Sequence, residues 1–93
     1  MCGIVGIIKK SSKVNESVVR KMCNSIIHRG PDSEGVYCYK NIGLGMRRLS
    51  ILDLKNGSQP IFNKSKNKVL VFNGEIYNYK TLRNKLKNSG YIF

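Results

Sequence analysis

The 93-residue sequence is poor in the residues that bind metals or form structural disulfides. It has three cysteines, one histidine and five acidic residues, and it contains no Cys-x-x-Cys pair. A structural zinc site needs four suitably spaced Cys or His ligands, so we expect no metal site. An odd number of cysteines without a paired spacing is also no basis for a disulfide framework. These scarcities favour a reduced protein that works without a bound metal.

The sequence also lacks long apolar runs. No stretch approaches the roughly 18 residues of a membrane-spanning helix. The first residues lack the charged start, long apolar core and cleavage site of a secretory signal peptide. We therefore expect a cytoplasmic protein with no membrane partner.

Acidic residues are outnumbered by basic ones, with 17 Lys and Arg against five Asp and Glu, for a net charge of +12. Such a balance raises the possibility of nucleic-acid binding. However, the basic residues are scattered as singles and pairs, and no aromatic pattern of an RNA-binding sheet occurs. We expect no nucleic-acid partner, and a small basic binding module stays an alternative that the salt dependence of binding would test.

The apolar residues of the first third of the chain follow two different periods. Residues 3–8 form a short β-branched run that predicts a buried strand. From Asn15 the period becomes that of an amphipathic helix, with Glu16 favourably placed in its first turn and Asn15 as a candidate cap. The apolar helix positions are Val18, Val19, Met22, Cys23, Ile26 and Ile27. We expect the helix to stop near His28, because a Gly-Pro pair follows.

Short strands dominate the middle of the chain. The predicted strands cover residues 35–40, 42–52 and 68–72. A turn at Lys40-Asn41 separates the first two, and residues 53–60 are expected to form a loop rich in turn formers.

A second helix is expected near the end of the chain, marked by Tyr79, Leu82 and Leu86 and ended by Gly90. Residues 91–93 resemble the start of a further strand, which would need partners. We therefore expect an α+β fold and a chain that is a fragment of one domain.

Cys2 differs from the other cysteines because its position adds chemistry. The simple interpretation is a buried thiol at the start of the first strand. The chemical one is removal of Met1, which leaves a thiol and a free α-amine on one residue. That amine has a pKa of about 7.7–8.0, so at neutral pH it is partly able to accept the thiol proton. By contrast, Cys23 on the helix stripe and Cys38 in a strand are expected to be packing residues.

The stretch "FNGE" at residues 72–75 is the second candidate for chemistry. An Asn-Gly pair after a strand can simply form a tight turn. Alternatively, Asn73 through its side-chain amide and Gly74 through its backbone N–H could stabilise an oxyanion. Glu75 and Arg48 could then hold the opposite charges of a zwitterionic substrate.

Five segments occur in an order that resembles a known family: "MCGIVGI", "HRGPDSEG", "RRLSILDL", "GSQPI" and "NGEIYNYKTLRNKL". Together they resemble the class II glutamine amidotransferase domain, most closely the glutaminase domain of glutamine-hydrolysing asparagine synthetases. The resemblance covers residues 2–93, and the implied fold is the N-terminal nucleophile fold, an αββα sandwich that is incomplete at the C-terminus.

The resemblance implies roles for particular residues. Cys2 would be the nucleophile that attacks the glutamine amide, while Asn73 and Gly74 would form the oxyanion hole. Arg48 would bind the α-carboxylate of L-glutamine, and Glu75 would lie near its α-amino group. The strand that would line the pocket consists of Arg48, Leu49, Ser50, Ile51 and Leu52.

The resemblance also implies parts that this sequence lacks. A further acidic residue for the α-amino group and the ATP-dependent synthetase domain are missing, so ATP and Mg²⁺ are expected only in that absent domain, and no cofactor in this segment. The implied partners are L-glutamine and a downstream synthetase domain or polypeptide that converts aspartate to asparagine. Two alternatives stay open, a truncated and inactive remnant, or the glutaminase domain of a related amidotransferase with another ammonia acceptor.

Overall fold

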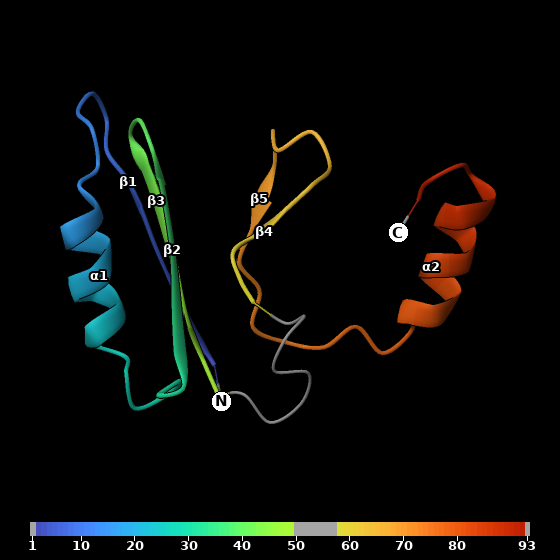
Figure 1. Ribbon diagram of the computed structural model, residues 1–93, viewed down its shortest axis with the longest axis horizontal. Coiled ribbons are helices and arrows are strands. Elements are labelled where there is room, and N and C mark those ends of the chain that lie inside the picture. Colours follow the sequence, from blue (N-terminus) through green and yellow to red (C-terminus); the bar gives the residue numbers. More distant parts are fainter. Residues whose placement is uncertain (1, 50–57, 93) are drawn as a thin grey trace.

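The computed structural model describes residues 2–49 and 58–92, which form two small antiparallel sheets and two helices (Figure 1). The elements are β1 (Gly3–Ile8), α1 (Glu16–Asn24), β2 (Ser33–Tyr39), β3 (Ile42–Arg48), β4 (Ile61–Phe62), β5 (Val69–Leu70) and α2 (Tyr79–Asn88). This mixture of helices and antiparallel strands confirms the α+β class expected from the sequence.

The larger sheet has three strands in the order β1-β3-β2, with β3 in the centre. Strands β2 and β3 form a hairpin whose turn contains Lys40 in the left-handed region, at φ 53°. Gly3 of β1 pairs with Arg47 of β3, and Arg48 pairs with Ser33 of β2. The start of β1 and the end of β3 therefore lie side by side at one end of the sheet.

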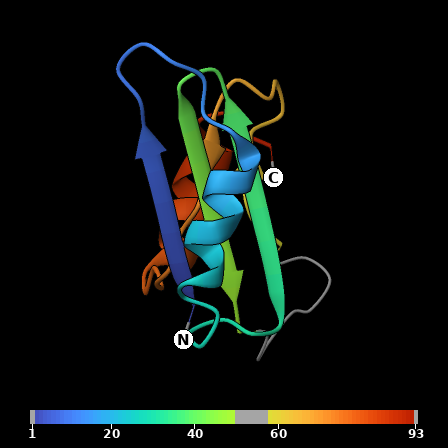
Figure 2. The ribbon, with the colours of Figure 1, turned by 90° about the vertical axis from the view of Figure 1, so that its left-hand side faces the viewer.

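Helix α1 packs against one face of this sheet (Figure 2). Val19 and Cys23 of the helix are fully buried, as expected from the apolar stripe. The helix approaches closely because β3 carries Gly43 and Gly45 beneath it. A Cβ at Gly45 would lie 2.5 Å from the Cys23 sulfur, and one at Gly43 would lie 2.6 Å from Val19.

The ends of α1 differ in detail from the prediction. The helix stops at Asn24 rather than near His28, and residues 25–29 continue as turns. At its end the Ser25 hydroxyl donates to the Met22 carbonyl at 2.6 Å, which satisfies one free helix acceptor. Asn15 occupies the N-cap with extended backbone, but its side chain makes no capping hydrogen bond. Glu16 instead pairs with Arg20 one turn later, at 3.2 Å.

The second sheet is smaller than the sequence indicated. The strand expected over residues 68–72 is β5, only two residues long, and β4 lies just beyond the loop predicted for residues 53–60. Strand β3 ends at Arg48, and the predicted continuation over residues 50–52 lies outside the described residues. The hairpin packs on the larger sheet through an edge-to-face contact between Phe62 and Tyr37, with ring centroids 5.4 Å apart.

Helix α2 forms where the apolar spacing predicted it and stands apart from the two sheets (Figure 1). Gly90, at φ +97°, follows its end, as expected for a helix terminator. No residue of Tyr79–Asn88 is buried, so its apolar stripe is uncovered. Tyr91 and Ile92 form no strand, contrary to the prediction for residues 91–93, of which Phe93 lies outside the described residues. Neither helix is long and apolar enough to cross a membrane, over the part of the chain that the structure describes.

Candidate active site

The two faces of the larger sheet have different surroundings. Side chains alternate along a strand, and Gly3, Gly43 and Gly45 all face α1. Arg48 therefore lies on the opposite face, and the same alternation continued one residue before β1 places Cys2 there too. The β4–β5 hairpin lies over this second face, where Phe62 meets Tyr37.

Cys2 is a free, half-buried cysteine immediately before β1. Its main-chain oxygen accepts two side-chain hydrogen bonds from distant parts of the sequence. The Asn73 amide donates at 2.9 Å, and the Arg29 guanidinium donates through Nε at 3.2 Å. The structure thus places the predicted nucleophile and the predicted oxyanion donor next to each other, although 71 positions separate them.

The chain after β5 has no regular secondary structure at Asn73 and bends at Gly74, so these residues do not form the hydrogen-bonded tight turn that was the alternative. The ring of Phe72 folds back beneath Gly74, so that a Cβ there would lie 3.0 Å from the ring. The Asn73 side chain is exposed on the side where Cys2 lies, and its amide is occupied by the Cys2 carbonyl. The same donor can serve a substrate oxygen if it changes acceptor, because apo hydrogen bonds in active sites often rearrange when substrate binds.

Arg48 lies at the end of β3, half-buried and beside Cys2 in the register of the sheet. The segment before β2 fixes this end of the strand. The Asp32 N–H donates to the Arg48 carbonyl at 3.0 Å, and Pro31 forms an isolated bridge with Arg48. The neighbouring Arg47 is 7% exposed and donates through Nε to the Gly30 carbonyl at 2.8 Å.

These contacts give the segment "HRGPD" a structural role that the sequence analysis did not assign. It is tied to the end of β3 through Arg47, and it delivers the Arg29 side chain to Cys2. The only sequence signal was that Arg29 belongs to a segment shared with the resembling family. The Cys2 carbonyl becomes the acceptor for Arg29 only because this segment folds back toward the sheet.

The other predicted site residues either make no side-chain hydrogen bond with Cys2 or lie outside the described residues. Glu75 is exposed, two residues beyond Asn73, and Leu49 is half-buried just after β3. Ser50, Ile51 and Leu52, predicted to line the pocket, lie outside the described residues.

Glu34 links α1 to the larger sheet. It accepts a hydrogen bond from Arg20 at 2.8 Å and lies 3.9 Å from the Arg47 guanidinium. The Cys23 thiol is buried beside it, and burial first, then the Glu34 charge, raises the pKa of this thiol. Burial also raises the pKa of Cys38. Both shifts lower the thiolate fraction at neutral pH, which agrees with packing roles for these two cysteines.

Alkylation tests this difference between the cysteines. With iodoacetamide near neutral pH, Cys23 is expected to react at least about tenfold more slowly than Cys2, because only the thiolate attacks and access is blocked. Its rate should rise as the pH approaches the raised pKa, and in denaturant all three cysteines should react alike. Peptide mapping by mass spectrometry measures each rate, and equal rates at Cys23 and Cys2 in the native protein would contradict the assignment.

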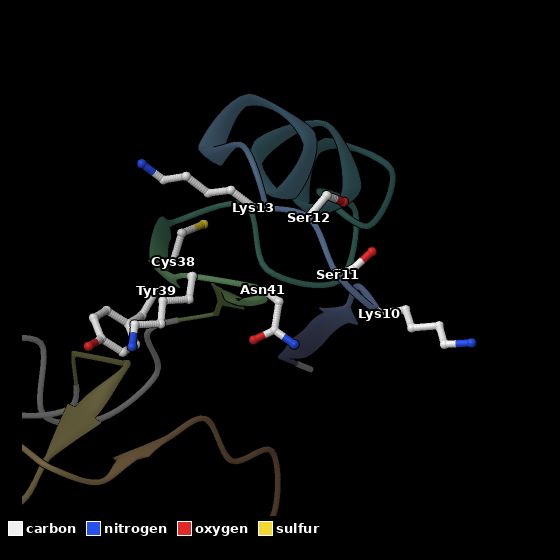
Figure 3. Close-up of a pocket in the computed structure, with 8 residues that line it drawn as sticks. Lys10, Ser11, Ser12, Lys13, Cys38, Tyr39 and Asn41 are labelled. Atoms are coloured by element: carbon white, nitrogen blue, oxygen red, sulfur yellow. The ribbon is translucent and has the colours of Figure 1, made fainter.

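The described surface also has hollows away from this site. A cavity of about 640 Å³ lies at the other end of the larger sheet, around the turn after β1 and the β2–β3 turn. Figure 3 shows that the Lys10 and Lys13 side chains at its rim extend in opposite directions, away from the hollow. They do not converge on a common ligand position, so the chemistry points to the Cys2 end.

The chain is similar to known proteins along its whole length. A family model described as the glutamine amidotransferase domain matches residues 1–93. Glutamine-hydrolysing asparagine synthetase 1 of Bacillus subtilis (strain 168) is 43% identical over 97 residues, covering 100% of this chain and 15% of that protein. Asparagine synthetase 2 of the same organism is 44% identical over 92 residues, covering 95% and 12%. Asparagine synthetase 2 of Arabidopsis thaliana is 40% identical over 90 residues, covering 95% and 16%.

Proposed function

The chain belongs to the class II glutamine amidotransferase domain family, and on that premise we propose that it carries the glutamine-hydrolysing site of an asparagine-synthetase-type enzyme. It spans about 12–16% of the length of these three relatives, so the activity of a whole enzyme is part of the proposal. The observation that carries it is the hydrogen bond between the Asn73 amide and Cys2 at 2.9 Å. This contact brings together the candidate nucleophile and the candidate oxyanion donor.

The proposed reaction begins after removal of Met1. The α-amine of Cys2 accepts the thiol proton, and the sulfur attacks the carboxamide carbon of glutamine. The tetrahedral intermediate collapses as the C–N bond breaks, and the leaving nitrogen takes the proton from the α-ammonium group and departs as ammonia. Water then attacks the γ-glutamyl thioester, which releases glutamate and restores the thiol.

The negative charge of the intermediate develops on the former amide oxygen. Asn73 donates through its side-chain amide and Gly74 through its backbone N–H, and such donors act most strongly where they are already in position. Arg48, at the end of β3 beside Cys2, binds the α-carboxylate, and Glu75 the α-amino group. Leu49 and the segment that follows it form the wall of the pocket.

The fold is proposed to be an αββα sandwich of the N-terminal nucleophile type. The larger sheet with α1 on one face supplies one helix layer and one sheet layer of this arrangement (Figure 2). The ATP- and Mg²⁺-dependent conversion of aspartate to asparagine is proposed for a synthetase domain or polypeptide that works with this chain. The described residues contain no group of three His, Cys, Asp or Glu side chains that could hold a metal ion.

Covalent trapping tests the proposed site. The purified protein is incubated with glutamine and assayed for ammonia and glutamate, then treated with a glutamine analogue that carries an electrophilic ketone in place of the amide. We expect stoichiometric labelling at Cys2 and protection by L-glutamine, but not by D-glutamine. Labelling at Cys23 or Cys38 instead, or no protection by glutamine, would overturn the proposal. If ammonia forms but the synthetase domain or polypeptide that works with this chain passes it to an acceptor other than aspartate, the glutaminase stands and the asparagine-synthetase assignment fails.

A further inference from the structure

We infer that Gln59 is a positioning residue for the oxyanion donor, because its side chain holds the main chain of Phe72 and so places Asn73 beside Cys2. This inference deepens the proposed function and rests on it. Gln59 belongs to the segment "GSQPI", to which neither the sequence chemistry nor the proposed reaction assigns a role.

The carboxamide of Gln59 binds both polar groups of one residue's main chain. Its Oε1 accepts the Phe72 N–H at 2.6 Å, and its Nε2 donates to the Phe72 carbonyl at 2.9 Å. A primary amide can do this because it presents one acceptor and one donor side by side. An ordinary antiparallel neighbour offers the same pair of bonds through its backbone.

The register of the small sheet places Gln59 opposite Phe72. Ile61 pairs with Leu70, so the register continued outward by two residues places Gln59 opposite Phe72. In this register Pro60 faces Val71, and Gln59 reaches Phe72 with its side-chain carboxamide in place of its backbone. The Gln59 side chain therefore continues the pairing beyond the two-residue strands.

Gln59 is itself seated on the sheet that carries Cys2. A Cβ on Gly35 of β2 would overlap the Gln59 carbonyl, so the glycine provides the space in which this main chain lies. Gly35 pairs with Met46 of β3, which pairs in turn with Ile4 of β1. Cys2 lies two residues before Ile4, on the same face by alternation. Cys2 and Gln59, the residue that holds Phe72, are therefore positioned against the same sheet.

The hydrogen bonds from Gln59 to Phe72 also constrain Asn73, because the two residues share one rigid peptide group. The Phe72 carbonyl belongs to the peptide group that contains the Asn73 N–H, and this group is planar. Fixing that oxygen fixes the direction in which the chain enters Asn73, whose amide then reaches the Cys2 carbonyl at 2.9 Å. An oxyanion donor is effective only when it is held close to its working position, so looseness at Phe72 should weaken transition-state binding more than substrate binding.

Substitution of Gln59 by methionine tests this inference, because methionine has similar length but neither hydrogen-bonding group. For Gln59→Met we expect kcat for glutamine to fall about tenfold while KM stays within about twofold, as for loss of preorganisation rather than of substrate contacts. The matched control is Asn63→Ala, at the other end of the same hairpin, where Asn63 accepts the Lys68 N–H at 2.8 Å. That variant loosens the hairpin but is expected to keep kcat within about twofold.

A second variant and a second measurement separate positioning from general damage. Gln59→Glu keeps the acceptor for the Phe72 N–H but loses the donor to its carbonyl, so its kcat should lie between those of the wild type and Gln59→Met. Hydrogen exchange of the Phe72 amide should be slow in the wild type and in Gln59→Glu, and fast in Gln59→Met.

Failure of the positioning role can be distinguished from failure of the proposed function. Wild-type kcat in Gln59→Met, or an equal loss in Asn63→Ala, would overturn the positioning role while the glutaminase stands. Equal Phe72 exchange in wild type and Gln59→Met would overturn it even in a protein that hydrolyses no glutamine. Absence of hydrolysis and of Cys2 labelling in the wild type would instead defeat the proposed function.

Discussion

Replacing Cys2 by alanine is expected to reduce glutamine hydrolysis by at least about 10³-fold, because the attacking sulfur and the covalent route are lost together. The fold should be retained, since the Asn73 and Arg29 bonds at this residue go to its main-chain oxygen and do not need the thiol. Ammonia release measures the activity, and circular dichroism verifies the fold. The control is Cys38→Ala, which removes a half-buried thiol far from the site and should leave the rate almost unchanged.

A companion variant separates the thiol from the α-amine. Insertion of lysine between Met1 and Cys2 should prevent removal of the methionine and leave the cysteine inside the chain. This protein keeps the thiol but has no amine to accept its proton, so glutamine hydrolysis should fall nearly as far as in Cys2→Ala. Its cysteine should still react with iodoacetamide. Hydrolysis at the wild-type rate would show that another group acts as the base.

The spacing of apolar residues predicted those strands and helices that are determined by short-range patterns in the sequence. The β-branched run at residues 3–8 formed a strand and the apolar stripe around Val19 and Cys23 formed a helix, since each buries one face against the other. The expected burial of the strand was wrong, because β1 lies at the edge of its sheet and exposes Ile4 and Ile8. The stripe of α2 also predicted its helix, but periodicity reports which side of a helix is apolar and not what covers it. Strand β4 was missed because two residues are too few for an alternation to be recognised.

A candidate site could be proposed from the residues themselves only where a residue carries its own chemical signature. Cys2 has it through its position, and the Asn73-Gly74 pair through its donors. Arg29 and Gln59 have none, because their targets lie 27 and 13 residues away and become neighbours only when the sheets are in register. The register that joins them depends on close approaches such as that of Gln59 to Gly35, which no local pattern encodes.

The second large expected effect is the loss of kcat when the oxyanion donor Asn73 is removed. For Asn73→Ala we expect kcat to fall by about 10²–10³-fold with little change in KM, the usual cost of removing one such donor. The side chain meets the amide oxygen of glutamine most strongly when that oxygen becomes negative, so the loss should appear in the transition state and not in substrate binding. Steady-state hydrolysis of glutamine gives both constants.

A reversible inhibitor distinguishes this role from simple support of Cys2. The probe is a glutamine analogue in which an aldehyde replaces the amide, because its adduct with the Cys2 sulfur places an oxygen where the oxyanion forms. Asn73→Ala should lose affinity for the aldehyde in proportion to its loss of kcat, while iodoacetamide alkylation of Cys2 keeps its rate. If both reactions slow equally, the hydrogen bond from Asn73 to the Cys2 carbonyl serves mainly to hold the nucleophile. If neither changes, Asn73 is not the donor, and the Gly74 N–H must act with another group.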